Sequence, residues 1–264
     1  MNTLLRPATV FVLACCAASA IASEGAAPEP PLHGSTQLVV VTSEDWDSSE
    51  GELQAWARTA EGWRRHGAPF VVALGRSGSA WGIGLHPQGN EGPQKREGDG
   101  RSPAGIFALG TAFGYASHAD TRLHWQPMRE TSYCMDVADS PYYNRIVDAE
   151  QVGAEAVAGS TEPMRLDLHG DGDVRYQQGF VIEHNPRNVA GQGSCIFAHL
   201  WRTPGEATAG CTAMPPARMQ ALLGWLQPAA QPRFVLLPRA QYQQVQAAWQ
   251  LPALPAAGEQ EPPR

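Results

Sequence analysis

A cysteine and a histidine late in the chain could form a nucleophile and its base. His199 ends an apolar run, and Cys211 follows Gly210, with a turn at residues 203–205 between them. An imidazole can take the proton of a thiol, and the thiolate then attacks an acyl carbon. Gly210 has no Cβ, so its backbone can approach a bound carbonyl. The amides of Gly210 and Cys211 could stabilise the resulting oxyanion, and the segment therefore predicts cysteine-dependent acyl chemistry.

The first 22 residues predict a secretory signal peptide. Arg6 precedes an apolar stretch that ends in small residues, and we expect cleavage near Ala20 or Ala22. This indicates a periplasmic or secreted protein. The stretch is too short to be a convincing membrane span, and an uncleaved anchor is the alternative. Cys15 or Cys16 is a possible site for a lipid anchor.

Three cysteines remain in the mature chain, and an odd number leaves at least one thiol unpaired in an oxidising compartment. We expect Cys134 and Cys195 to form a disulfide, which would leave Cys211 free. The alternative is three buried, inert cysteines.

Length and composition favour one globular domain rich in turns. The chain has 264 residues, 43% of them hydrophobic, with 27 glycines and 22 prolines. Its formal net charge is −7 and no basic stripe is visible, so the sequence argues against nucleic-acid binding. No second apolar stretch is long enough to span a bilayer, and nothing in the sequence fixes the oligomeric state.

The pattern of apolar residues predicts a mainly β domain over residues 37–250, after a linker over 23–36 and before a disordered tail over 251–264. We expect about eight to ten short strands and two or three helices. Ser49 with Glu52 resembles a capping box and predicts a helix ending near residue 66. The other expected helices begin at residues 215 and 239. Expected strands cover 36–42, 69–74, 80–85, 103–109, 131–137, 176–184, 194–201 and 234–238, with a surface loop over 89–102.

Three motifs resemble the YkuD family, the L,D-transpeptidase catalytic domain. They are Arg101-Ser-Pro-Ala-Gly-Ile-Phe107, His199 and Ala209-Gly-Cys211. The resemblance implies an L,D-transpeptidase-like β-sandwich with two or three peripheral helices, in a periplasmic setting and without a cofactor. It implies peptidoglycan stem peptides as substrate and partner. It also places the nucleophile, which would form a thioester, on Cys211 and the base on His199.

Two departures from the family pattern leave other functions open. Ala209 stands where the family has a second histidine, and Ala213 where it has arginine or asparagine. One alternative is an L,D-carboxypeptidase or endopeptidase on the same substrate, and another is a catalytically silent cell-wall-binding module. A metal site built from His184, His199 and Cys211 is less favoured, because the sequence lacks close-spaced ligand pairs.

Five further residues are candidates for binding substrate. His184 and Asn185 follow a predicted strand and could bind substrate or orient the base, although an exposed strand-end histidine is the alternative. Trp201, Arg202 and Tyr133 are candidate cleft residues. Arg202 could hold a peptide carboxylate in a bidentate fork, where Ala213 cannot.

Overall fold

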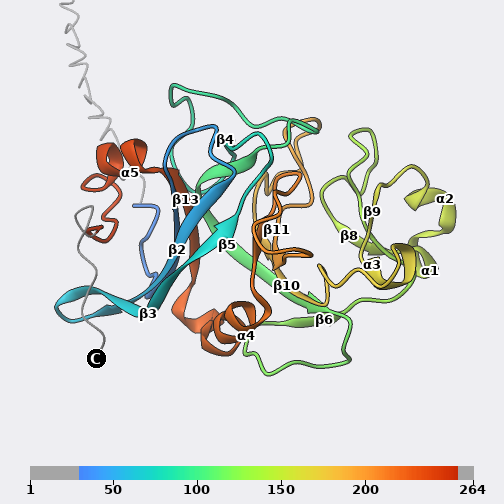
Figure 1. The fold of residues 1–264 in the computed structure, drawn as a ribbon. Coiled ribbons are helices and arrows are strands. Elements are labelled where there is room, and N and C mark those ends of the chain that lie inside the picture. The colour runs from blue at the N-terminus through green and yellow to red at the C-terminus, as the bar shows by residue number, and fades with distance from the viewer. Residues whose placement is uncertain (1–29, 255–264) are drawn as a thin grey trace, which may run out of the picture.

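A single large sheet that closes on itself forms the body of the molecule (Figure 1). The computed structural model describes residues 30–254. Around the closed sheet the strands run in the order β10-β11-β12-β3-β2-β1-β13-β5, and pairing of β5 with β10 completes the circuit. Strands β4 and β6 pair with β5 outside that circuit. The bounds are β1 (Gln37–Ser43), β2 (Glu50–Thr59), β3 (Gly62–Ala73), β4 (Ser79–Trp81), β5 (Ser102–Gly114), β6 (Trp125–Pro127), β10 (Gln178–Ile182), β11 (Phe197–Leu200), β12 (Thr212–Met214) and β13 (Arg233–Pro238).

A smaller sheet, built by the chain between β6 and β10, lies beside the closed sheet (Figure 1). Its strands run in the order β8-β7-β9, and three short helices accompany them. The Cys134–Cys195 disulfide fastens β7 to the segment that leads into β11. The bounds are β7 (Ser132–Cys134), β8 (Ile146–Asp148), β9 (Glu162–Pro163), α1 (Ala149–Val152), α2 (Ala154–Val157) and α3 (Leu166–His169).

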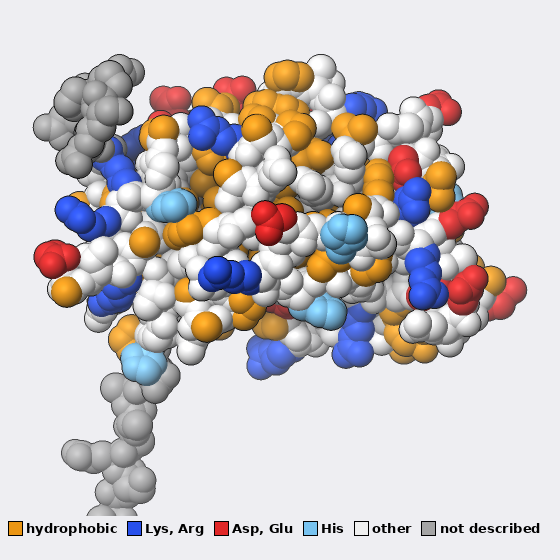
Figure 2. All heavy atoms as spheres, turned by 90° about the horizontal axis from the view of Figure 1, so that it is seen from below, with side chains coloured by type: hydrophobic (Ala, Val, Ile, Leu, Met, Phe, Trp, Pro, Cys, Tyr) orange, Lys and Arg blue, Asp and Glu red, His pale blue; other side chains and the backbone are white. Residues whose placement is uncertain are grey.

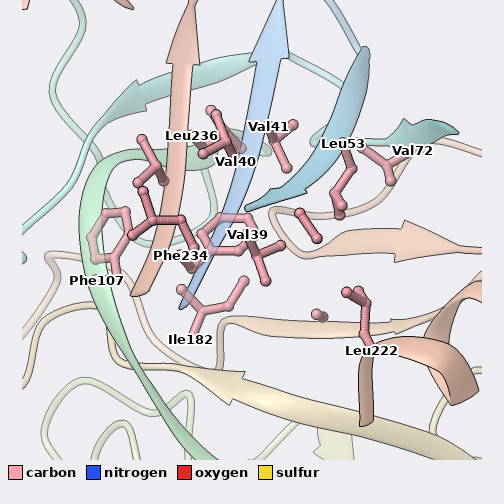
Figure 3. Close-up of a cluster of buried hydrophobic side chains, with 14 of the residues drawn as sticks. Val39, Val40, Val41, Leu53, Val72, Phe107, Ile182, Leu222, Phe234 and Leu236 are labelled. Atoms are coloured by element: carbon pink, nitrogen blue, oxygen red, sulfur yellow. The ribbon is translucent and has the colours of Figure 1, made fainter. Parts of the chain in front are cut away.

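The main core lies on both sides of β1, inside the closed sheet and beneath the segments that cover its outer face. Strand β1 runs between β2 and β13, and its residues are buried on both faces because the chain covers it on either side. Figure 3 shows Val39, Phe107 and Ile182 turned toward one another, with Leu222 of α4 (Pro216–Trp225) closing one end. Helix α5 (Arg239–Val245) contributes the fully buried Tyr242. Burying these apolar side chains is the main favourable term in the stability of the fold.

The predicted helix ending near residue 66 is wrong, because this segment is the β2–β3 hairpin. Leu53 and Trp56 fit a helical spacing, yet residues 53–56 are buried consecutively. Such a run fits a strand covered on both faces. Trp56 pairs with Leu38 on one side and with Arg65 on the other. The strand predicted over residues 80–85 is the short β4, and it pairs in parallel with β5.

The mainly β fold with few helices is confirmed, and so is the disulfide between Cys134 and Cys195. Parts of the predicted linker and tail pack on the core, where Leu32 and Leu251 are buried. The predicted signal peptide over residues 1–22 and the lipid anchor lie outside the described residues. Within residues 30–254 no helix has the length and apolar character of a membrane span. On the face in Figure 2, basic and acidic side chains are interspersed.

Candidate functional site

Strands β11 and β12 bring His199 and Cys211 to one wall of a cavity. The strands are parallel, with His199 opposite Ala213, and Cys211 directly precedes β12. Side chains alternate along a strand, so residues 211 and 213 face the same side as their neighbour 199. The cavity has a volume of about 240 Å³, and both His199 and Cys211 line it. Residues 12 apart in the sequence are thereby placed in one chamber.

Cys211 is the free cysteine of the described residues, and its sulfur is held by peptide groups. The Phe197 amide donates to Sγ at 3.3 Å, and Sγ donates to the Cys195 carbonyl at 3.5 Å. The residue is 8% exposed. Burial is the main cause that raises the pKa of the thiol to about 12, and nearby Glu162 adds to it. The resting group is therefore a neutral thiol.

His199 is a neutral imidazole with one nitrogen fixed. Its Nδ1 lies 2.6 Å from the Leu200 carbonyl, which assigns the proton to Nδ1 and leaves Nε2 as an acceptor. Burial lowers its pKa to about 4, against the smaller effect of that hydrogen bond. Among the described residues, neither ring nitrogen is hydrogen-bonded to Cys211. Proton transfer from the thiol therefore requires a side-chain rotation or a bridging water.

The turn before Cys211 offers one open amide. A Cβ at Gly210 would lie 2.9 Å from the Arg101 carbonyl oxygen, so only glycine fits without a shift. The Gly210 amide donates to Thr208 Oγ1 at 3.0 Å, and that hydroxyl donates to the Cys211 carbonyl at 2.7 Å. The Cys211 amide has no partner within residues 30–254. Of the two predicted oxyanion donors, Cys211 is thus open and Gly210 is occupied.

Two of the predicted binding residues line the cavity, and Arg202 is already paired. Trp201 and Arg202 follow β11 directly and lie at the cavity wall. The Arg202 guanidinium forms an ion pair with Glu206, including an Nε–Oε2 distance of 3.1 Å. Its side chain is 57% exposed, so solvent can compete for the pair. A substrate carboxylate would have to displace Glu206 to use the fork.

His184 and Asn185 are not among the residues that line this cavity, and neither side chain is hydrogen-bonded to His199. His184 is buried, its Nδ1 accepting from the Ile83 amide at 3.2 Å and its Nε2 lying 2.9 Å from the Gln192 carbonyl. It is thus neither a strand-end surface residue nor a partner for His199 and Cys211 in a metal site. Asn185 is also fully buried, and its side chain bonds the backbone at Val189. Both residues hold the loop in front of β11.

Tyr133 lies elsewhere, so its predicted place in the cleft is wrong. It belongs to β7, and its ring packs against His169 with centroids 5.8 Å apart. It lines a separate hollow under α1 and α2, with Glu130 among the other lining residues. The strand alternation that turns Cys134 toward the disulfide turns its neighbour away from Cys211.

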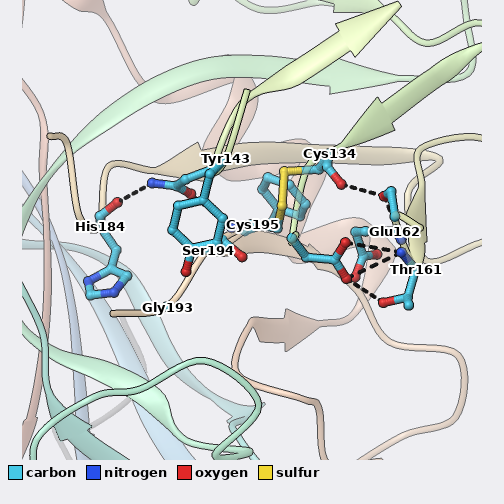
Figure 4. Close-up of a disulfide and its surroundings, with 12 residues drawn as sticks. Cys134, Tyr143, Thr161, Glu162, His184, Gly193, Ser194 and Cys195 are labelled. Carbon is cyan, nitrogen blue, oxygen red and sulfur yellow. Dashed lines mark hydrogen bonds between the residues drawn. A yellow bond between two sulfur atoms is a disulfide. The ribbon is translucent and has the colours of Figure 1, made fainter. Parts of the chain in front are cut away.

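The smaller sheet supplies a cavity wall that sequence reasoning missed. Figure 4 shows Thr161 and Glu162 on one side of the disulfide, with Tyr143 and Ser194 on the other. Thr161, Glu162 and Ser194 line the same cavity as Cys211. The predicted Cys134–Cys195 bond was the available signal, because it requires the strand through Cys134 to lie beside Cys195.

Loop 89–102 also contributes to the cavity and is not merely a surface loop. Lys95 is 4% exposed, and its Nζ lies 2.6 Å from Asp99 Oδ1. Lys95 and Glu97 both line the cavity. The Glu97 carboxylate accepts hydrogen bonds from the hydroxyls of Tyr143 and Ser194. This carboxylate therefore joins the loop to the smaller sheet at the cavity.

Glu162 and Tyr176 form a shielded pair in the cavity wall. The Tyr176 hydroxyl donates to Glu162 Oε1, and Tyr176 is buried. Burial raises the pKa of the Glu162 carboxyl to about 7, against the effect of the hydrogen bond. The Tyr176 ring meets the His199 ring edge-on, with centroids 5.3 Å apart.

Comparison with known proteins finds one weak structural similarity. No known protein family and no curated protein matches the chain. The chain is similar to the crystal structure of the helical cell shape determining protein Pgp2 from Campylobacter jejuni, with 12% sequence identity and a TM-score of 0.36. The match covers 77% of this chain and 48% of that protein, so the chain spans about half the length of that protein.

Proposed function

We propose that this protein is a periplasmic cysteine acyltransferase of the L,D-transpeptidase type that acts on peptidoglycan stem peptides. The observation that carries the proposal is the shared cavity of Cys211 and His199. The open Cys211 amide and the fixed His199 tautomer agree with the roles of oxyanion donor and base. The motif resemblance to the YkuD family supplies the substrate class.

The proposed reaction has two acyl-transfer steps. The Cys211 sulfur attacks the amide carbonyl carbon that follows the L-centre of a stem tetrapeptide, and His199 Nε2 takes the thiol proton. The C–S bond forms, the C–N bond breaks, and the leaving amine takes the proton from the imidazolium. An acceptor amine or water then attacks the thioester, the C–S bond breaks, and the proton returns to sulfur through His199. An amine gives transpeptidation, whereas water gives carboxypeptidase or endopeptidase activity.

A catalytically silent binding module on the same scaffold is the second candidate. The raised thiol pKa and the missing thiol–imidazole hydrogen bond favour it, because thiolate is the reactive form. Substrate binding would have to bring the two side chains together for the enzymatic function. The two candidates differ in whether peptidoglycan changes chemically or is only bound.

Muropeptide profiling tests the proposal with wild type and Cys211→Ala. Wild-type expression is expected to add 3–3 cross-links if an amine is the acceptor, or tripeptides if water is. Cys211→Ala is expected to abolish either product. Glu183→Gln is a matched control, since this carboxyl does not line the cavity, and it should retain the wild-type profile. Identical profiles for wild type and Cys211→Ala, with binding to isolated peptidoglycan retained, would establish the binding module.

A further inference from the structure

Glu162 reaches the Cys211 cavity from a separate sheet, at a position fixed by the disulfide. In the β7–β9 pairing Glu162 lies directly opposite Cys134. Residues opposite each other in antiparallel strands project to the same face. Cys134 is bonded to Cys195, whose carbonyl oxygen accepts from the Cys211 sulfur. A continuous structural path thus connects this carboxyl to the nucleophile.

Tyr176 connects the same carboxyl to the base. Its hydroxyl donates to Glu162, and its ring packs edge-on against both His199 and Phe197, at centroid distances of 5.3 and 5.5 Å. Phe197 in turn donates its amide to the Cys211 sulfur. Because Tyr176 is buried, its ring cannot turn without moving these neighbours. The carboxyl therefore fixes the surface against which the imidazole rests.

We infer that Glu162 is a positioning residue for Cys211 and His199. It holds the Tyr176 ring against the imidazole of His199, and its ionised carboxylate opposes formation of the Cys211 thiolate. This inference rests on the proposed function for its catalytic meaning. The effect of the Glu162 carboxyl on the reactivity of the Cys211 thiol can be measured without peptidoglycan.

Several charged groups besides Glu162 act on the protonation of Glu162, Cys211 and His199. Asp136 raises the Glu162 pKa and Arg175 lowers it. Lys95 and Arg175 favour the Cys211 thiolate, against Glu162. Around His199, Arg175 disfavours the imidazolium and Asp173 favours it. Among these groups Glu162 has its pKa at about 7, so its charge changes near neutral pH.

The test compares thiol reactivity in wild type and Glu162→Gln across pH. The full chain is treated with methyl methanethiosulfonate, and modification of Cys211 is followed over time by mass spectrometry of its peptide. Glutamine keeps an oxygen acceptor for the Tyr176 hydroxyl but carries no charge. At about pH 9 we expect Glu162→Gln to react roughly tenfold faster, because the wild-type carboxylate opposes the thiolate. At about pH 5.5 the ratio of rates should approach one, since the carboxyl is then neutral in wild type too.

Glu183→Gln is the matched control for this comparison. Glu183 is a carboxyl whose pKa is also raised by burial, but it does not line the cavity. Glu183→Gln should therefore react as wild type does. A rate ratio for Glu162→Gln that is constant with pH, or an equal effect in Glu183→Gln, would overturn the inference.

Should Glu162→Gln fail to fold, Tyr176→Phe provides the test. It keeps the ring against His199 but removes the hydroxyl that lowers the Glu162 pKa. The pH at which Glu162 begins to oppose thiol reactivity should then move upward, and an unmoved profile would overturn the inference. If the profiles move as expected while the muropeptides do not change, the proposed function fails and the inference about the thiol stands.

Discussion

At the scale of single residues, burial decides the electrostatic state of Cys211 and His199, the proposed nucleophile and base. The sequence shows their thiol and imidazole near a glycine, and the structure places both side chains in one cavity. Their shifted pKa values arise mainly from burial by residues distant in sequence. Such burial cannot be deduced from the spacing of 199 and 211. The same holds for Glu162, whose carboxyl enters the cavity from another sheet.

Gly210 permits a residue-scale prediction about stability. Gly210→Ala would place a Cβ 2.9 Å from the Arg101 carbonyl oxygen, so the backbone must shift. We expect a loss of about 1–3 kcal/mol in the free energy of unfolding, measured by denaturant titration. Gly224→Ala is the matched control within α4, where the nearest atom to a new Cβ is 3.9 Å away. The control should be neutral or stabilising by up to about 1 kcal/mol, and equal losses in both variants would contradict the argument.

At the scale of elements, local sequence patterns predicted those strands well that are buried along almost their whole length. The strands near residues 37–43 and 233–238 follow from continuous β-branched and apolar runs. The hairpin of β2 and β3 was mistaken for a helix because its apolar spacing also fits a period of 3.6 residues. What decides the outcome is pairing with β1, and a neighbour that lies across a sheet leaves no local signature.

Asn144 supports an element-scale prediction about the junction of the two sheets. Its Nδ2 donates to the carbonyl oxygens of His184 and Asn185, and its Oδ1 accepts from the Cys195 amide. Asn144→Ala would leave these groups unpaired, and we expect a loss of about 2–3 kcal/mol in the free energy of unfolding. Asn144→Asp keeps the acceptor for Cys195 and should lose less. Chemical denaturation measures both variants. A loss in Asn144→Asp as large as the loss in Asn144→Ala would refute this ranking.

At the scale of the whole molecule, buried histidines make stability depend on pH. Burial lowers the pKa of His184 and of His199 from 6.5 to about 4, so both are neutral in the folded chain. The unfolded chain binds these protons more readily, and stability is lost as pH falls from about 6.5 toward 4. Glu162 acts in the opposite direction, because its raised pKa favours the folded state in acid.

Burial also lowers the pKa of His86 and raises that of Glu183, and these two shifts oppose each other. With His184 and His199 against Glu162, we expect a net fall on the order of 3 kcal/mol in the free energy of unfolding between about pH 7 and pH 4. Denaturant titrations at several pH values measure it directly. A stability that is flat or rises toward acid would show that the histidines are not held neutral.

The closure of the sheet by β5 and β10 buries much of this interior. It joins segments about seventy residues apart, so a local sequence pattern could not predict it.

The Cys134–Cys195 disulfide joins two parts of the chain that contribute differently to the cavity. The closed sheet fixes the thiol, the imidazole and the open amide, while the excursion over residues 128–177 builds the opposite wall and is anchored at Cys195. Residues of that excursion other than Cys134, Glu162 and Tyr176 can therefore vary while Cys211 and His199 keep their geometry. Grafting an excursion that keeps these three residues is a direct route to a cavity of altered selectivity.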